Sequence, residues 1–137
     1  MCLMAMACLA VLAIPATAGA WTPSYQDRAD AKRFARVFWA ARGEYVPCRG
    51  VRLVWVPRRL VRDAFGHGTL AAVFDEGWTI YYNQAAGWSW GKLCSVTVHE
   101  YGHLIGYRHS RNPDSIMYPS YRDSSWWPRH PACDFTA

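Results

Sequence analysis

The sequence predicts a small α+β domain, in which a twisted mixed sheet packs with an N-terminal helix and a second helix near residue 100. Three observations lead to this fold class. Residues 24–42 have apolar side chains at helical spacing between helix-start and helix-stop signals. Residues 51–56, 70–74 and 78–83 are short apolar or alternating runs, which is typical of strands. Residues 94–105 carry a second apolar stripe with helical period.

Residues 1–20 are expected to be a secretory signal peptide, which leaves 21–137 as a single domain of about 117 residues. This stretch contains no charged residue and ends in two small-x-small cleavage patterns, at 16–18 and 18–20. It is short for a stable membrane span, which needs ~20 apolar residues. No Lys or Arg follows Met1, so the true start codon and the cleavage site stay open.

The chain is basic, with a formal net charge of +5. Its Lys and Arg residues are scattered, and no nucleic-acid-binding motif accompanies them, which disfavours nucleic acid as a partner. A basic surface of this kind is consistent with simple solubility or with adhesion to an anionic cell wall. The sequence does not indicate an oligomeric state.

Three cysteines remain after the expected leader, an odd number. Export would permit one disulfide and leave one thiol. The spacing of Cys48, Cys94 and Cys133 does not choose among the three possible pairs.

The first half of the domain is interpreted as scaffold. Ser24 is a good N-cap for the helix over 24–42, and Gly43 lies just past its end. The strand over 51–56 stops at Pro57. Residues 58–65 fit either a loop or a short helical turn.

The functional residues are concentrated between residues 99 and 109. On a helix, His99 and His103 are one turn apart and project from one face, so two imidazoles can bind one metal ion. Gly106 can adopt positive φ and end the helix, which lets His109 return as a third nitrogen ligand. Three nitrogens with an open fourth position are typical of a catalytic zinc. Glu100 is rotated about 100° from His99 and can reach a water at the metal.

This pattern, HExxHxxGxxH, resembles the zinc motif of the metzincin metallopeptidases. The segment 115–119 fits the Met-turn of that family, and the continuation through Tyr121 is most similar to the matrixin branch. The resemblance implies that Met117 packs beneath the metal and that Pro119 and Tyr121 line the specificity pocket. It also implies that Leu70 and Ala71 lie on an edge strand that holds the substrate backbone.

The sequence departs from matrixins in two places. The histidine that binds a structural zinc in matrixins corresponds to Ala72 here, and His67 and His130 are too scattered to replace it. A second zinc or a calcium site is therefore not supported. The segment after the Met-turn has no helical period, so no clear final helix is expected.

Together these features predict a secreted zinc-dependent endopeptidase that binds one catalytic Zn²⁺. Glu100 would be the general base for a metal-activated water, and the partner would be a peptide or protein substrate. Two alternatives stay open. One is a zinc hydrolase of cell-wall peptide cross-links, and the other is a non-catalytic zinc-bound recognition module.

Overall fold

A computed structural model describes residues 21–46, 50–73 and 78–119 of the chain. The elements follow one another in the order α1 (Tyr25–Ala40), β1 (Arg52–Val56), α2 (Arg58–Phe65), β2 (Ala71–Val73), β3 (Thr79–Asn83) and α3 (Trp90–Leu104). The predicted α+β class is confirmed, and so are the two long helices and the three strands.

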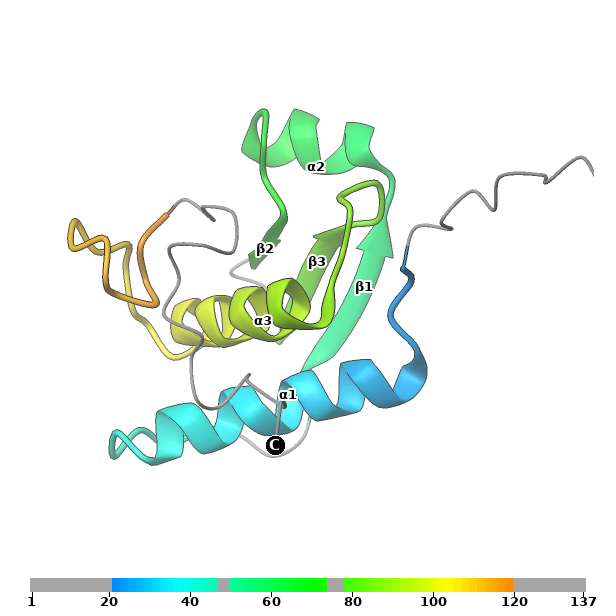
Figure 1. Cartoon of the computed structure of the whole chain (residues 1–137). Helices are drawn as coiled ribbons and strands as arrows, with labels where there is room; N and C mark the ends of the chain where they lie inside the picture. The colour runs from blue at the N-terminus through cyan, green and yellow to red at the C-terminus, as the bar shows by residue number, and fades with distance from the viewer. Residues whose placement is uncertain (1–20, 47–49, 74–77, 120–137) are drawn as a thin grey trace, which may run out of the picture.

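The strands form one mixed sheet in the order β1-β3-β2. β1 runs parallel to β3, with Leu53 opposite Ile80, and β2 runs antiparallel to β3, with Ala72 opposite Tyr81. The short strand β2 therefore forms one edge of the sheet. In Figure 1, α1 runs alongside α3, and α2 lies at the end of the sheet farthest from α1.

α1 begins at a capping box and is fastened to α3. The Ser24 hydroxyl accepts from the Asp27 backbone N–H at 3.1 Å, and the Asp27 carboxylate accepts from the Ser24 N–H at 2.7 Å. Farther along α1, the buried Trp39 indole N–H donates to the Val98 carbonyl at 2.9 Å. This bond satisfies a polar group inside the core and fixes the two helices against each other.

α3 uses its two faces for different purposes. Cys94, Val98 and Tyr101 are buried in the core, as the helical stripe in the sequence predicts. The Thr97 hydroxyl lies 2.8 Å from the hydroxyl of Tyr82, which anchors the helix to β3. The opposite face is free to carry functional side chains.

Residues 58–65 form a helix, where the sequence left a loop or a helical turn open. Pro57 lies at the N-cap with φ −55°, an angle that suits a helix start. Val61 is 1% exposed and is the one buried residue of α2. The apolar residues Leu60, Val61, Ala64 and Phe65 recur at helical spacing, but eight residues are too few for this spacing alone to identify a helix.

Several expectations fall outside the described residues. They concern the signal peptide over 1–20, the pairing of Cys48 and Cys133 with the buried Cys94, the role of Tyr121, and the segment after the Met-turn. In the part of the chain that the structure describes, none of the helices combines the length and the apolarity that crossing a membrane requires.

Gly102 is where α3, α1 and the Met-turn come closest together. A Cβ at this position would lie 2.3 Å from the Met117 Sδ and 2.7 Å from Cζ2 of Trp39. Real Cβ atoms do not approach other atoms so closely, so a glycine is required for the packing.

We predict that Gly102→Ala lowers the free energy of unfolding by about 1–3 kcal/mol, because the methyl group forces Met117 or Trp39 out of position. Gly91→Ala, in the first turn of the same helix, is the control. Its Cβ meets nothing within 4 Å, and alanine has the higher helix propensity, so the change is expected to be neutral or stabilising by up to ~1 kcal/mol. Equal urea midpoints for the two variants would contradict this packing.

Candidate metal centre

Three imidazoles converge on one point of the surface. His99 and His103 project from α3, and His109 comes from the segment that follows the helix. One ring nitrogen from each lies within 4.8 Å of the others. The Nε2 atom of His103 is 3.1 Å from Nε2 of His99 and 3.1 Å from Nε2 of His109. Among the described residues, this is the one group of three or more His, Cys, Asp or Glu side chains close enough to share an ion.

Backbone carbonyls orient two of the rings. The Nδ1 atom of His99 donates to the Ile116 carbonyl at 2.7 Å, and Nδ1 of His103 donates to the Tyr107 carbonyl at 2.8 Å. A carbonyl oxygen can only accept, so the proton of each neutral ring resides on Nδ1. The Nε2 lone pairs are then left free, as in metal-binding histidines whose other nitrogen is held by an outer hydrogen bond.

The donor set fits a zinc ion. Lone pairs that face each other at 3.1 Å repel unless a proton or a cation lies between them. With Zn–N bonds of about 2.0–2.1 Å and tetrahedral angles, two ligand nitrogens lie about 3.4 Å apart. The observed separations are within a few tenths of an ångström of that value.

A turn at Gly106 brings the third imidazole back. Gly106 has φ +96°, which L-residues with a side chain rarely adopt. The Tyr107 N–H then donates to the Gly102 carbonyl at 2.8 Å, and this bond closes the end of the helix. The chain reverses within one residue and places His109 beside His103, as the sequence predicts.

Glu100 lies in the same cleft as the three rings. It is 5% exposed, and its Oε2 atom has no hydrogen-bond partner among the described residues. Burial raises the pKa of this carboxyl to about 8. Burial also lowers the pKa of His99 to about 4, against the opposing effect of its bond to Ile116, and lowers the pKa of His109. A neutral imidazole is the form that binds metals.

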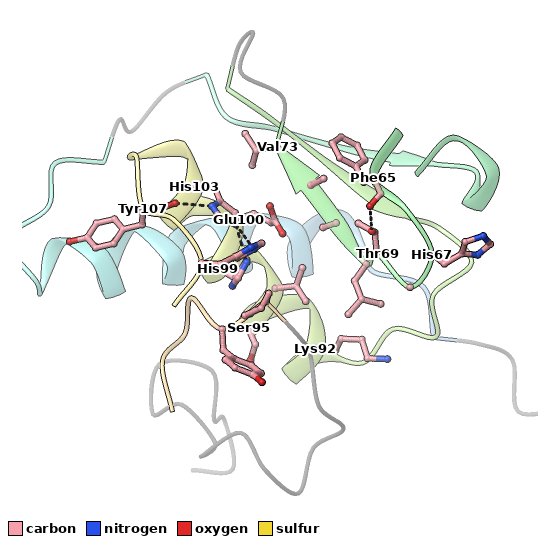
Figure 2. Close-up of a pocket in the computed structure, with 18 of the residues that line it drawn as sticks. Phe65, His67, Thr69, Val73, Lys92, Ser95, His99, Glu100, His103 and Tyr107 are labelled. Atoms are coloured by element: carbon pink, nitrogen blue, oxygen red, sulfur yellow. Dashed lines mark hydrogen bonds between the residues drawn. The ribbon is translucent and has the colours of Figure 1, made fainter. Parts of the chain in front are cut away.

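The cleft has a volume of about 1080 Å³ and also contains residues expected from the sequence to contact substrate. Leu70 and Ala71 line it from the β2 side, and Pro119 lines it from the segment after the Met-turn. Figure 2 shows Glu100 beside His99 and His103, with Val73 and Thr69 of the β2 region across the cleft. Tyr121 lies outside the described residues.

Met117 lies in the core against α3. It is 3% exposed, and its side chain packs against Gly102, between Glu100 and His103 in sequence. The Met117 carbonyl accepts from the Ser110 N–H at 2.8 Å, which ties the Met-turn to the residue after His109.

Sequence reasoning missed three supporting contributions. Gly102 permits the close approach described above, and the carbonyl of Ile116 orients His99. Tyr107 orients His103 with its carbonyl, and its hydroxyl donates to Glu44 at 2.5 Å. The Tyr107 ring also lies 4.7 Å from the ring of Trp39. Position 107 is unspecified in the HExxHxxGxxH motif, so the motif does not mark Tyr107. Its partner Glu44 lies 63 residues away in the sequence.

The titration of Glu100 gives a pH prediction for protein stripped of metal by a chelator. Folded Glu100 keeps its proton up to about pH 8, while in the unfolded chain it ionises near ~4.3. The folded state therefore binds an extra proton, and stability falls as pH rises through this range. Below about pH 6.5, the lowered pKa of His99 makes stability rise with pH, and this offsets the effect of Glu100.

The free energy of unfolding should thus fall by about 1–2 kcal/mol between about pH 6.5 and 8, measured by urea titration. Glu100→Gln should remove this decline. An unchanged decline in the variant would show that another group is responsible.

Comparison with known proteins supports the resemblance carried by the motif. The model of the matrixin family matches residues 61–129. The chain is 46% identical over 63 residues to macrophage metalloelastase of Rattus norvegicus. This match covers 40% of this chain and 14% of that protein. It is 38% identical over 68 residues to matrilysin of Felis catus, covering 42% and 26%. With matrix metalloproteinase-20 of Homo sapiens it shares 36% over 63 residues, covering 40% and 13%.

The matched segment thus spans between about an eighth and a quarter of the length of these relatives. The family model covers a larger share of this chain than these relatives do. It matches about half of the 137 residues, including the whole stretch from His99 to Met117. On that match the chain belongs to the matrixin family, whose members are zinc-dependent endopeptidases.

Proposed function

We propose that this chain is a secreted zinc-dependent endopeptidase with a single catalytic Zn²⁺ held by His99, His103 and His109. The observation that carries the proposal is the convergence of three Nε2 atoms beside the buried Glu100 carboxyl, whose Oε2 has no hydrogen-bond partner among the described residues. Family membership supports both the metal and the class of reaction.

Zinc in this position supplies Lewis-acid chemistry, polarising a peptide carbonyl and making a water easier to deprotonate. Glu100 acts as the base: one carboxylate oxygen accepts a proton from the water whose oxygen bonds to the carbonyl carbon. When the C–N bond breaks, Glu100 delivers that proton to the departing amine nitrogen. A neighbouring cation favours the ionised carboxylate, so the raised pKa of Glu100 falls toward the range a base requires.

The edge strand β2 suits an extended peptide. The Leu70 carbonyl already accepts from the Asn83 N–H at 2.8 Å within the sheet. Because hydrogen-bonding groups alternate along an antiparallel strand, the N–H and C=O of Ala71 face the open edge. A substrate backbone can pair there as an added strand, with Leu70 contributing its side chain and Pro119 lining the opposite wall. We also retain Tyr121 as a wall residue on the basis of the motif.

The two alternatives differ from the proposed endopeptidase in what they act on or in having no hydrolytic activity. The net charge of +5 favours contact with an anionic cell wall, where peptide cross-links would be cleaved by the same chemistry. A recognition module would bind zinc without hydrolysis, and the buried Glu100 argues against it.

The purified chain should be incubated with casein and with purified cell wall, each with and without chelator. An endopeptidase releases peptides from casein in the absence of chelator, a wall hydrolase acts on cell wall alone, and a recognition module acts on neither. Chelation should abolish hydrolysis, and added zinc should restore it.

We predict that Glu100→Ala binds one zinc per chain and lowers kcat/KM for peptide cleavage by about 10²–10⁴-fold, since only proton transfer is lost. His103→Ala, by contrast, should lose the zinc itself. Metal content by atomic absorption and cleavage of a fluorogenic peptide measure the two effects. Undiminished cleavage by Glu100→Ala would refute the assignment of the base.

Tyr107→Phe keeps the ring contact with Trp39 and the hydrogen bond from His103 to the backbone carbonyl of residue 107. It removes the hydrogen bond from the hydroxyl to Glu44. We predict a loss of zinc affinity smaller than the ~10–100-fold expected when an outer partner is removed outright. Competition with a zinc-binding dye measures it. Because Glu44→Ala breaks the same bond, the double variant should be no weaker than either single one; additive losses would show that the bond does not act on the metal loop.

A further inference from the structure

A second hollow of about 250 Å³ adjoins the substrate cleft near the start of β2. The two hollows share one wall, made of four consecutive residues: His67, Gly68, Thr69 and Leu70. The second hollow is bounded on its far side by α2, which contributes Arg58 and Arg62. Figure 2 shows His67 and Lys92 at the end of the cleft away from Tyr107.

The charged side chains at this end are basic. Arg58 and Arg62 line the second hollow, and Lys92 lines the cleft from the first turn of α3. The Lys92 ammonium donates to the Gly87 carbonyl at 2.5 Å. Among the described residues that line either hollow, Glu100 is the single carboxylate, and it belongs to the metal centre.

One nearby acid offsets part of this charge. The Arg62 guanidinium is paired with the Asp63 carboxylate at 2.7 Å, and both side chains are largely exposed. Arg58 and its neighbour Arg59 are exposed, and neither forms an ion pair with another described residue. Arg62 is neutralised by Asp63, and Arg58 adds a positive charge, so the end of the cleft formed by Arg58, Arg62, His67 and Lys92, hereafter the basic end, keeps a net positive charge even when Lys92 is not counted.

A bound peptide would reach the basic end. An added strand advances about 3.3 Å per residue. A peptide paired with Ala71 and extended past Leu70 would run toward His67, which lines both hollows. Side chains about three to five residues from the scissile bond on that side would then approach the second hollow, which Arg58 and Arg62 line.

We propose that the basic end is a subsite for acidic side chains, so that the preferred substrates are extended peptides with Asp or Glu a few residues to one side of the cleaved bond. This inference rests on the proposed peptidase function and adds the class of substrate. The attraction between an acidic side chain and exposed arginines is modest, and salt screens it. It selects among peptides that the metal centre can already cleave.

The test uses the zinc-loaded full chain and one cleavable peptide in three series, with Glu, Gln or Lys placed singly at three to five residues on each side of the scissile bond. We expect Glu to raise kcat/KM about threefold to tenfold over Gln on one side only, and Lys to lower it. The Glu-to-Gln ratio should approach one at 1 M salt, where the screening length is ~3 Å.

Matched variants locate the effect. In Arg58→Gln/Arg62→Gln the Glu-to-Gln ratio should fall to about one. Arg33→Gln is the control, because Arg33 is likewise an exposed helix arginine paired with an aspartate, Asp30, but lies on α1 and lines neither hollow. It should keep the full ratio. A ratio of one in the native chain, or a ratio equally lost in Arg33→Gln, would overturn the subsite.

Peptide binding separates this proposal from the peptidase function. The same peptides, labelled for fluorescence anisotropy, should bind zinc-loaded Glu100→Ala about threefold to tenfold more tightly with Glu than with Gln. Equal Kd values overturn the subsite whether or not any peptide is cleaved. A preserved binding preference in a chain that cleaves none of the peptides overturns the peptidase function and leaves the acidic subsite standing.

Discussion

The proposed metal centre depends on two backbone carbonyls that fix the tautomers of two histidines. Ile116 and Tyr107 each accept from an Nδ1–H, and this leaves the Nε2 lone pairs of His99 and His103 directed at a common point. Neither carbonyl belongs to α3. Both are brought to it by the reversal at Gly106 and by the Met-turn, whose methionine can reach the helix only because residue 102 has no side chain.

The same arrangement is costly in the folded chain. Nε2 of His103 lies 3.1 Å from Nε2 of His99 and from Nε2 of His109, where lone pairs repel, and beside them is a buried carboxyl with one oxygen that has no partner among the described residues. The core opposite α3 offsets this cost with buried aromatic side chains, including Tyr82 stacked on Trp55 at 4.6 Å. A bound cation would relieve both strains at once, since it separates the lone pairs and favours the ionised carboxylate, so metal binding and folding stability are linked.

Local features of this fold could be predicted from sequence, and distant pairings could not. The i, i+4 spacing of His99 and His103 and the glycine that turns the chain toward His109 lie within one short segment, where helix geometry decides the outcome. The bond between Glu44 and Tyr107 joins residues 63 positions apart, and no local pattern encodes it. α2 was ambiguous for a related reason: a helix of eight residues is marginal on its own, and the burial of Val61 depends on tertiary packing.

The sheet topology explains why the hollow lined by the arginines of α2 adjoins the cleft lined by α3. Parallel strands need a crossover connection, and between β1 and β3 the chain uses α2 followed by β2. β2 then pairs with β3 at the edge of the sheet and lines the same cleft as the three histidines. The turn that immediately precedes β2 therefore lies at one end of this cleft. The residues of α2 and of the turn over 66–70 are in this position. With the subsite proposed above, substrate preference could change through α2 without disturbing the histidines, because Val61 is the one buried residue of this helix and its arginines are exposed.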